Sequence, residues 1–162
     1  MSFEVFVIIN IVIIFEIVFN DRIVSMDEIV LGFDFGVKNI GLAVGNRLTN
    51  TAQPIAILKA NEGQPDWDEV EKHIKEWTPT LLVVGMPYTA DGTETEHMRK
   101  IRKFMNRLHG RFGLPVEEVD ERLSSKESEQ YMKPSKKGKK GQLDAHSAAI
   151  IVERYLNGDL IF

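Results

Sequence analysis

A mixed α/β fold, with one sheet flanked by helices, is predicted by the order of apolar patterns along the chain. Three short segments rich in β-branched residues follow one another between residues 28 and 58. Segments with helical periodicity then alternate with two further strand-like segments as far as residue 156. A three-strand meander followed by alternating helices and strands is typical of a mixed sheet covered by helices. We therefore expect a five-stranded mixed sheet.

The first three strands are predicted from apolar runs that end in glycine or in a polar turn. They cover Glu28–Phe35, Ile40–Val44 and Thr51–Leu58. Gly36 ends the first run. Pro54 has no amide hydrogen to donate, so it predicts an edge position or a β-bulge in the third strand.

A helix and a buried strand are predicted next. Asp66 and Glu69 have the spacing of a capping box at the start of the helix. Apolar residues then recur on one helical face: Trp67, Val70, Ile74 and Trp77. Leu81–Gly85 is continuously apolar, as expected for a strand that is buried on both faces.

A second helix, from a capping box at Thr93 and Glu96 to about His109, precedes the last strand. Its predicted buried face consists of Met98, Ile101, Met105 and Leu108. The strand covers Val116–Val119, after Pro115.

The last part of the chain is predicted to be helical apart from one basic loop. A helix starts in Ser124–Met132, a Lys- and Gly-rich loop covers Lys133–Gly141, and Leu143–Leu156 forms the final helix. Small and apolar residues of that helix are expected to face inward: Ala145, Ala148, Ala149, Val152 and Leu156.

The first 25 residues differ in composition from the rest, because 17 of them are apolar and Arg22 is their only base. The apolar run Val5–Phe19 is short for a membrane span and contains Glu16, which is costly in lipid. It also lacks the basic start and the small-residue cleavage site of a secretory signal. We expect an extension, non-native or disordered, before a domain at residues 26–162. A membrane anchor is the alternative.

The overall composition is that of a globular protein, with 43% hydrophobic and 27% charged residues. The chain contains no cysteine. This excludes a disulfide framework, a thiolate-ligated metal and a cysteine nucleophile, and it fits a cytoplasmic protein.

Acidic residues occupy three positions that an α/β fold could bring together. Asp34 closes the first strand, Asp120 and Glu121 close the last, and Asp144 lies in the first turn of the final helix. Adjacent strand residues point to opposite faces, so at most one of the pair faces the same side as Asp34. Converging carboxylates need a cation, and oxygen ligands suit Mg²⁺ or Mn²⁺. Taken singly, each acid is equally explained by a turn, a solvated strand end or dipole compensation.

Basic residues gather in two clusters despite the net charge of −4. The first lies in a stretch without acids: Arg99, Lys100, Arg102, Lys103, Arg107 and Arg111. The second is Lys133, Lys136, Lys137, Lys139 and Lys140. This separation from the acids predicts contacts with a phosphate backbone, although a run of bases can also be a solvated face.

Four segments resemble, in order, the motifs of the YqgF family. They are FDFGVKNIGLAVGN (33–46), VVGMPYTADGTE (83–94), DERLSSKESE (120–129) and LDAHSAAIIVERYL (143–156). Members of the family are described as pre-16S ribosomal RNA nucleases and as RuvC-like Holliday junction resolvases. Asn39 departs from the arginine that usually follows Lys38, which removes one possible phosphate contact.

The resemblance implies an RNase H-like fold and metal-dependent hydrolysis of phosphodiester bonds. Carried over by position, the catalytic and metal-binding acids are Asp34, Glu121 and Asp144. The residues expected to contact nucleic acid are Lys38, Arg99, Arg102, Lys103, Arg122, Lys136, Lys137, Lys139 and Lys140.

The resemblance favours a cytoplasmic nuclease that trims the 5′ side of precursor 16S ribosomal RNA, with structured RNA and pre-ribosomal particles as partners. A Holliday junction resolvase is the alternative of the same class, and it requires a two-fold dimer. The sequence leaves monomer and homodimer open. A non-catalytic ribosome-assembly factor and a fragment of an actin- or Hsp70-like phosphotransferase are the alternatives of other classes, and the chain length opposes the last.

Overall fold

The computed structural model describes residues 28–122 and 140–158. The expected N-terminal extension, the helix expected to start in Ser124–Met132 and residues 133–139 of the Lys-rich loop lie outside this part. Within it, no helix is both long enough and apolar enough to cross a membrane.

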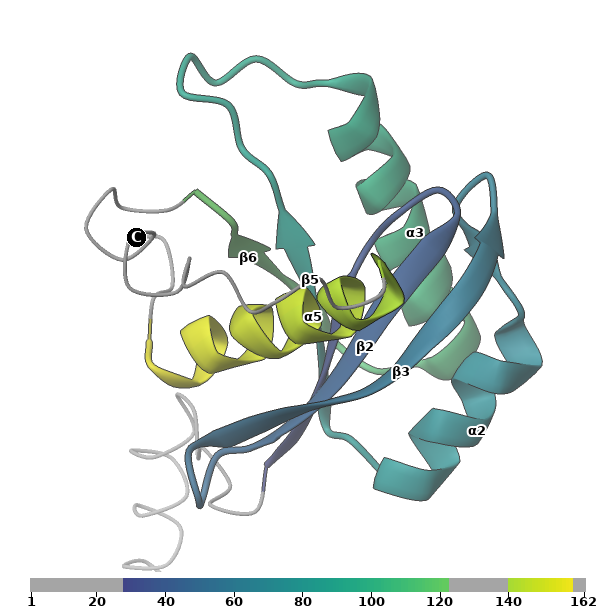
Figure 1. Cartoon of the computed structure of the whole chain (residues 1–162), viewed down its shortest axis with the longest axis vertical. Coiled ribbons are helices and arrows are strands. Elements are labelled where there is room, and N and C mark those ends of the chain that lie inside the picture. The colour runs from purple at the N-terminus through teal and green to yellow at the C-terminus, as the bar shows by residue number, and fades with distance from the viewer. Residues whose placement is uncertain (1–27, 123–139, 159–162) are drawn as a thin grey trace, which may run out of the picture.

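A six-stranded sheet with the order β4-β3-β2-β1-β5-β6 forms the centre of the described part (Figure 1). The strands are β1 (Ile29–Asp34), β2 (Asn39–Asn46), β3 (Thr51–Asn61), β4 (Gln64–Pro65), β5 (Leu81–Met86) and β6 (Val116–Asp120). β1, β2 and β3 form an antiparallel meander, and β5 and β6 run parallel to β1. The five predicted strands are confirmed, and the arrangement is RNase H-like. The additional β4 is too short to show a periodic pattern in the sequence.

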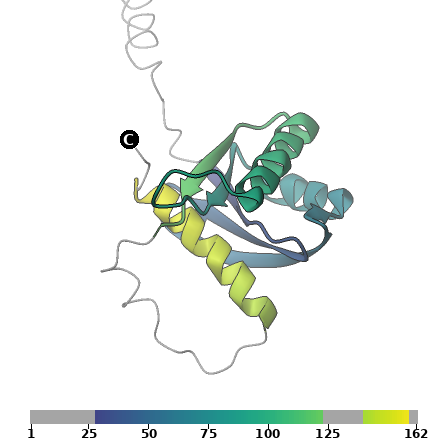
Figure 2. The ribbon, with the colours of Figure 1, turned by 90° about the horizontal axis from the view of Figure 1, so that it is seen from above.

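Within the described residues, three helices cover the two faces of this sheet. α2 (Trp67–Trp77) and α3 (Glu96–Phe112) lie on one face, and α5 (Lys140–Leu156) crosses the other, which we call the α5 face (Figures 1 and 2). α5 begins three residues earlier than predicted, so the end of the expected basic loop is helical.

The start of α2 agrees with the prediction, whereas the start of α3 does not. Asp66 caps α2, and its carboxylate accepts from the amide of Asp68 at 3.0 Å. Thr95, not Thr93, caps α3 and accepts from the amide of Met98 at 3.1 Å. Thr93 lies instead in the preceding turn, where its amide donates to Asp91 at 3.0 Å.

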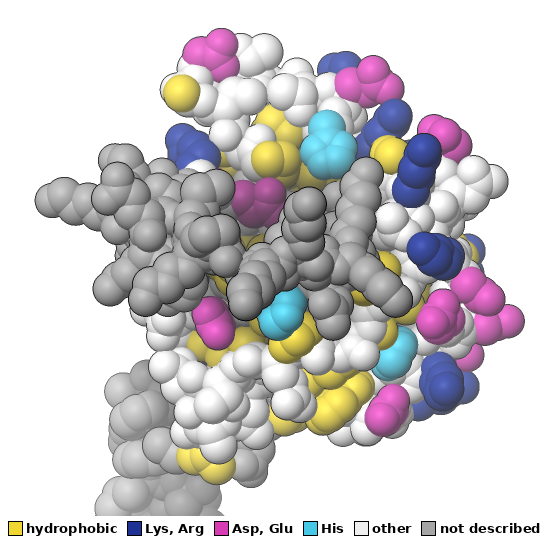
Figure 3. All heavy atoms as spheres, viewed as in Figure 1, with side chains coloured by type: hydrophobic (Ala, Val, Ile, Leu, Met, Phe, Trp, Pro, Cys, Tyr) yellow, Lys and Arg dark blue, Asp and Glu magenta, His cyan; other side chains and the backbone are white. Residues whose placement is uncertain are grey.

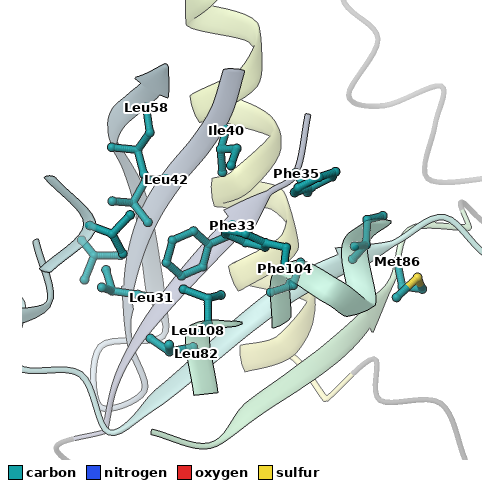
Figure 4. Packing of buried hydrophobic residues seen from close by; sticks show 14 of the residues in the cluster. Leu31, Phe33, Phe35, Ile40, Leu42, Leu58, Leu82, Met86, Phe104 and Leu108 are labelled. Carbon is teal, nitrogen blue, oxygen red and sulfur yellow. The ribbon is translucent and has the colours of Figure 1, made fainter. Parts of the chain in front are cut away.

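The larger apolar core lies between the sheet and the α2 and α3 layer (Figure 4). Phe33 from β1 meets Phe104 from α3 edge to face, with ring centroids 5.6 Å apart. Phe104 also stacks with Trp67 from α2 at 5.9 Å. Phe104 thus fills the buried position that was expected for the neighbouring Met105, which is only partly buried.

α5 packs close against the sheet at positions where glycines face it. A Cβ atom at Gly32 would lie 2.2 Å from Val152, and one at Gly45 would lie 2.3 Å from the same side chain. The five residues predicted to face inward are all buried. The small residues of α5 and the glycines of the sheet therefore fix how α5 lies on this face.

The predicted irregularity at Pro54 is a β-bulge. Leu42 pairs with Ala56, whereas the next residue, Ala43, pairs with Pro54, so Ile55 is the extra residue in β3. The bulge shifts the register of the rest of β3 by one residue relative to β2.

Candidate active site at the carboxyl ends of the parallel strands

Asp34 lies at the end of β1 on the α5 face of the sheet. Its neighbours Phe33 and Phe35 point into the core beneath α2 and α3, and side chains alternate along a strand. Its partner in the antiparallel ladder is Gly41 on β2, which has no side chain to obstruct it. Asp34 therefore stands at the rim where β1, β5 and β6 end, which we call the carboxyl-end rim.

Glu121 reaches the same place from β6. Its amide donates to the carbonyl of Met86 at 3.0 Å, which extends the β5–β6 pairing by one residue. Its carboxylate lies over Gly85, because a Cβ atom built there would be only 2.0 Å from Oε1 of Glu121. A glycine at this point of β5 is what leaves space for the carboxylate.

The strand register brings Asp34 and Glu121 together. Phe33 pairs with Val84 in the parallel β1–β5 ladder, so the next residues, Asp34 and Gly85, are neighbours at the carboxyl-end rim. Glu121 reaches over Gly85 from β6, the neighbour of β5 on the side away from β1. Two of the three predicted acids thus lie at neighbouring positions of the carboxyl-end rim, both on the α5 face.

The surroundings of Glu121 disfavour its charged form. Burial raises the pKa of Glu121 above its ordinary value, and the nearby charge of Asp120 adds to the increase. The guanidinium of Arg154 on α5 opposes this effect. A partly buried carboxylate beside a second carboxylate is a favourable position for a bound cation.

Asp120 does not join the two acids. It points to the other face, as the alternation of β6 requires, and its carboxylate binds Arg122. Oδ1 accepts from the Arg122 amide at 2.8 Å, and Oδ2 accepts from Nε at 2.7 Å. The Arg122 guanidinium also lies over the ring of Tyr88, 5.6 Å from the centroid.

The third predicted acid, Asp144, lies in the backbone of α5, and its side chain is outside the described part. The following residues Ala145 and His146 line a groove against Pro54–Ile57 of β3. Ile57 pairs with Gly41, the partner of Asp34, so α5 begins above the strands next to Asp34. Among the residues whose side chains are described, no group of three potential metal ligands occurs.

The predicted basic residues are divided between the two sides of the sheet. Arg99, Arg102 and Lys103 belong to α3, which covers the face opposite to Asp34 and Glu121. Arg102 is further engaged by Glu94 and by Glu118, the latter at 3.3 Å. The α3 cations are therefore not brought together with the acids.

Of the other predicted cations, some lie at the carboxyl-end rim and the rest lie outside the described part. Lys38 is exposed in the turn between β1 and β2, at the carboxyl-end rim, and Arg122 follows Glu121 directly. Lys136, Lys137 and Lys139, and the side chain of Lys140, lie outside the described part.

Arg154 and Tyr88 contact this site but were not predicted. Arg154 donates to the carbonyl of Asp120 at 3.0 Å, and Tyr88 donates through its hydroxyl to Glu118. An arginine in the last turn of a helix and a tyrosine after a strand are common, so only the tertiary contacts distinguish them.

Known proteins that are similar to this chain include a solved structure and two relatives matched by sequence. RuvC of T. thermophilus in complex with a Holliday junction substrate aligns with a TM-score of 0.49 and 15% identity, over 82% of this chain and 95% of that one. A relative from Aeromonas salmonicida (strain A449), named "Putative pre-16S rRNA nuclease", is 49% identical over 130 residues, which are 78% of this chain and 93% of the relative. A relative of the same name from Shewanella denitrificans is 48% identical over 134 residues, 81% of this chain and 95% of the relative.

Residues 28–158 match the family described as "RuvX: Holliday junction resolvase". This match spans every described helix and strand. Together with the identity to the two relatives, it shows that the chain belongs to the RuvX family.

Proposed function

We propose that this protein is a cytoplasmic, metal-dependent nuclease that processes the 5′ end of precursor 16S ribosomal RNA. The observation that carries the proposal is that the Glu121 carboxylate lies over Gly85, the neighbour of Asp34 at the carboxyl-end rim. Ligands of open α/β sheets bind at the carboxyl ends of the strands, so the acids lie where a substrate would approach. The names of the two relatives favour ribosomal RNA as the substrate.

The residues present suit a hard divalent cation. Asp34 and Glu121, with Asp144 from α5, would hold one or two Mg²⁺ or Mn²⁺ ions through carboxylate oxygens. The partly buried carboxylate of Glu121 supports this, because burial raises its pKa and a bound cation would stabilise its charged form. When bound, such ions activate water and stabilise the charge that develops on the phosphate.

The other residues of the site would orient the substrate. Arg122 directly follows Glu121, and Asp120 and the ring of Tyr88 fix its guanidinium at the carboxyl-end rim. Lys38 presents an ammonium group at the same rim. Such groups position a phosphate backbone without reading its sequence.

The test is cleavage of an RNA that contains the 5′ precursor segment joined to the start of 16S ribosomal RNA, with Mg²⁺ or Mn²⁺. We expect Asp34→Asn to lower the rate at least about a hundredfold while the fold is retained. Asp68→Asn, the same exchange at an exposed position of α2, is the matched control and should cleave normally. Undiminished metal-dependent cleavage by Asp34→Asn would refute the proposed site.

A Holliday junction resolvase is the second candidate, because the matching family carries that description. It is tested by offering a four-way DNA junction alongside the RNA. Paired symmetric cuts in the junction, with the RNA left intact, would replace our proposal by this one. Binding of RNA that survives chelation, without turnover under either ion, would indicate a non-catalytic assembly factor instead.

A further inference from the structure

We propose that Lys59, held by Asn39 beside Lys38, forms a phosphate-binding site for the nucleic acid strand that enters the acidic site. This inference rests on the proposed nuclease function and adds a residue to its substrate-binding surface. It starts from the observation that the α3 cations lie on the face opposite to the carboxylates.

Lys59 points to the α5 face, as Asp34 does. The preceding residue, Leu58, is fully buried in the core beneath α2 and α3, so Lys59 projects from the other side of β3. Its partner across the β2–β3 ladder is Asn39, and Nζ of Lys59 donates to Oδ1 of Asn39 at 3.0 Å. This hydrogen bond directs the ammonium group toward the turn that carries Lys38.

The charge of this pair of lysines is not neutralised within the described residues. Asn39 is a neutral acceptor, and no described carboxylate forms an ion pair with Lys38 or Lys59. Lys75 and Lys100 differ from them, since Lys75 pairs with Glu71 and Lys100 with Glu96, both at 3.2 Å. Figure 3, which views the molecule from the α5 side, shows Lys and Arg side chains along the right-hand margin, with acidic side chains between them.

The site lies at a suitable distance from the acids. Asp34 shares a row of the sheet with Gly41 and Ile57, and the Asn39–Lys59 pair lies two residues beyond that row toward the carboxyl-end rim. Two residues correspond to about 7 Å along a strand, and the two strand spacings from β1 to β3 to about 10 Å. A lysine side chain spans enough of this distance to bind a phosphate near the one that Asp34 and Glu121 would hold.

The backbone beneath the two lysines is fixed. The carbonyl of Lys38 accepts from the amide of Ala60 at 2.9 Å, and that of Val37 accepts from Gly63 at 2.9 Å. Gly63 has a φ of +78° and its α-carbon faces the ring of Phe35, so a side chain does not fit there. The β1–β2 turn is thus joined to the β3–β4 hairpin, which fixes the backbone that carries Lys38 and Lys59 at the carboxyl-end rim.

The experiment measures cleavage of the labelled precursor RNA over a series of salt concentrations. We expect Lys59→Ala to raise KM about fivefold. The slope of log(kcat/KM) against the logarithm of the salt concentration should become less steep by about 0.7, which corresponds to one lost phosphate contact on a single strand. Lys72→Ala, which removes the same charge from an exposed position on α2, is the matched control. It should change neither quantity.

A rescue separates a role of the charge from a structural role. Asn39→Arg in the Lys59→Ala background puts a cation back at the same place and should restore both KM and the salt slope. Asn39→Gln in that background should restore neither. Rescue by glutamine, or an unchanged KM and slope in Lys59→Ala, would overturn the inference while leaving the nuclease function in place. Absence of cleavage by the unaltered protein would refute the proposed function itself.

Discussion

The carboxylate of Glu121 occupies the space that a side chain at position 85 would fill, with its Oε1 2.0 Å from where the Cβ atom of that side chain would lie. Gly85 belongs to β5, the strand between Asp34 on β1 and the end of β6. The absence of a side chain at one point of the sheet therefore brings two acids from different strands together. The site depends on this glycine as much as on the acids.

Gly85→Ala should inactivate the protein without removing any charged group. Its methyl group would meet Glu121 and also Ile151, whose Cδ1 atom would lie 2.5 Å away. We expect cleavage to fall at least about a hundredfold because Glu121 is displaced. We also expect the free energy of unfolding to fall by about 1–3 kcal/mol. RNA cleavage and thermal unfolding measure the two effects.

Gly110→Ala is the control for this substitution. Gly110 lies in α3, and a Cβ atom there would have no neighbour within 4 Å. Alanine favours the helix over glycine by roughly 1 kcal/mol, so this variant should be active and slightly more stable. Full activity of Gly85→Ala would show that Glu121 does not need its position over β5.

Glu121→Gln should separate stability from activity. Burial of the Glu121 carboxylate opposes its ionised form, so the neutral amide should raise the melting temperature in a buffer that contains a chelator. Mg²⁺ should then stabilise the unaltered protein by mass action but not the variant, which lacks a ligand. Equal stabilisation of both proteins by Mg²⁺ would place the ion elsewhere.

The order of the strands and helices could be predicted because each long element has a clear apolar period. Leu81–Met86 is buried at every position, and the α5 residues predicted to face inward are buried. The position of Phe104 could not be predicted with the same success, because residues 104 and 105 are both compatible with one helical face. The ring contacts with Phe33 and Trp67 decide between them.

The partners of the site residues depend on strand register, which a single sequence does not define. The bulge at Ile55 moves Lys59 opposite Asn39, whereas an uninterrupted ladder from the Ala43–Pro54 pair would put Leu58 there. Pro54 predicts an irregularity in β3, but it does not predict which residues of β3 pair with β2 beyond it. Likewise, the basic face of α3 was evident in the sequence, but not the side of the sheet that α3 covers.

Stability at high pH should depend on Tyr155. Burial raises the pKa of Tyr155 above its ordinary value, with contributions from Glu117 and Glu28, and Arg47 opposes the shift. The folded state therefore retains the phenol proton that the unfolded chain loses near pH 10, so stability falls as the pH rises through that value. Tyr155→Phe should flatten this fall in melting temperature. If the melting temperature of Tyr155→Phe falls with pH as steeply as that of the unaltered protein, other groups cause the loss of stability at high pH.

Tyr88 should act on the substrate through Arg122. Its ring supports the guanidinium, and its hydroxyl is engaged separately by Glu118. Tyr88→Phe keeps the ring and should retain KM for the precursor RNA while lowering the melting temperature. Tyr88→Leu removes the ring, and we expect KM to increase about threefold, because a cation–π contact at an exposed site is weak. If the two variants raise KM equally, the hydroxyl and not the ring positions Arg122.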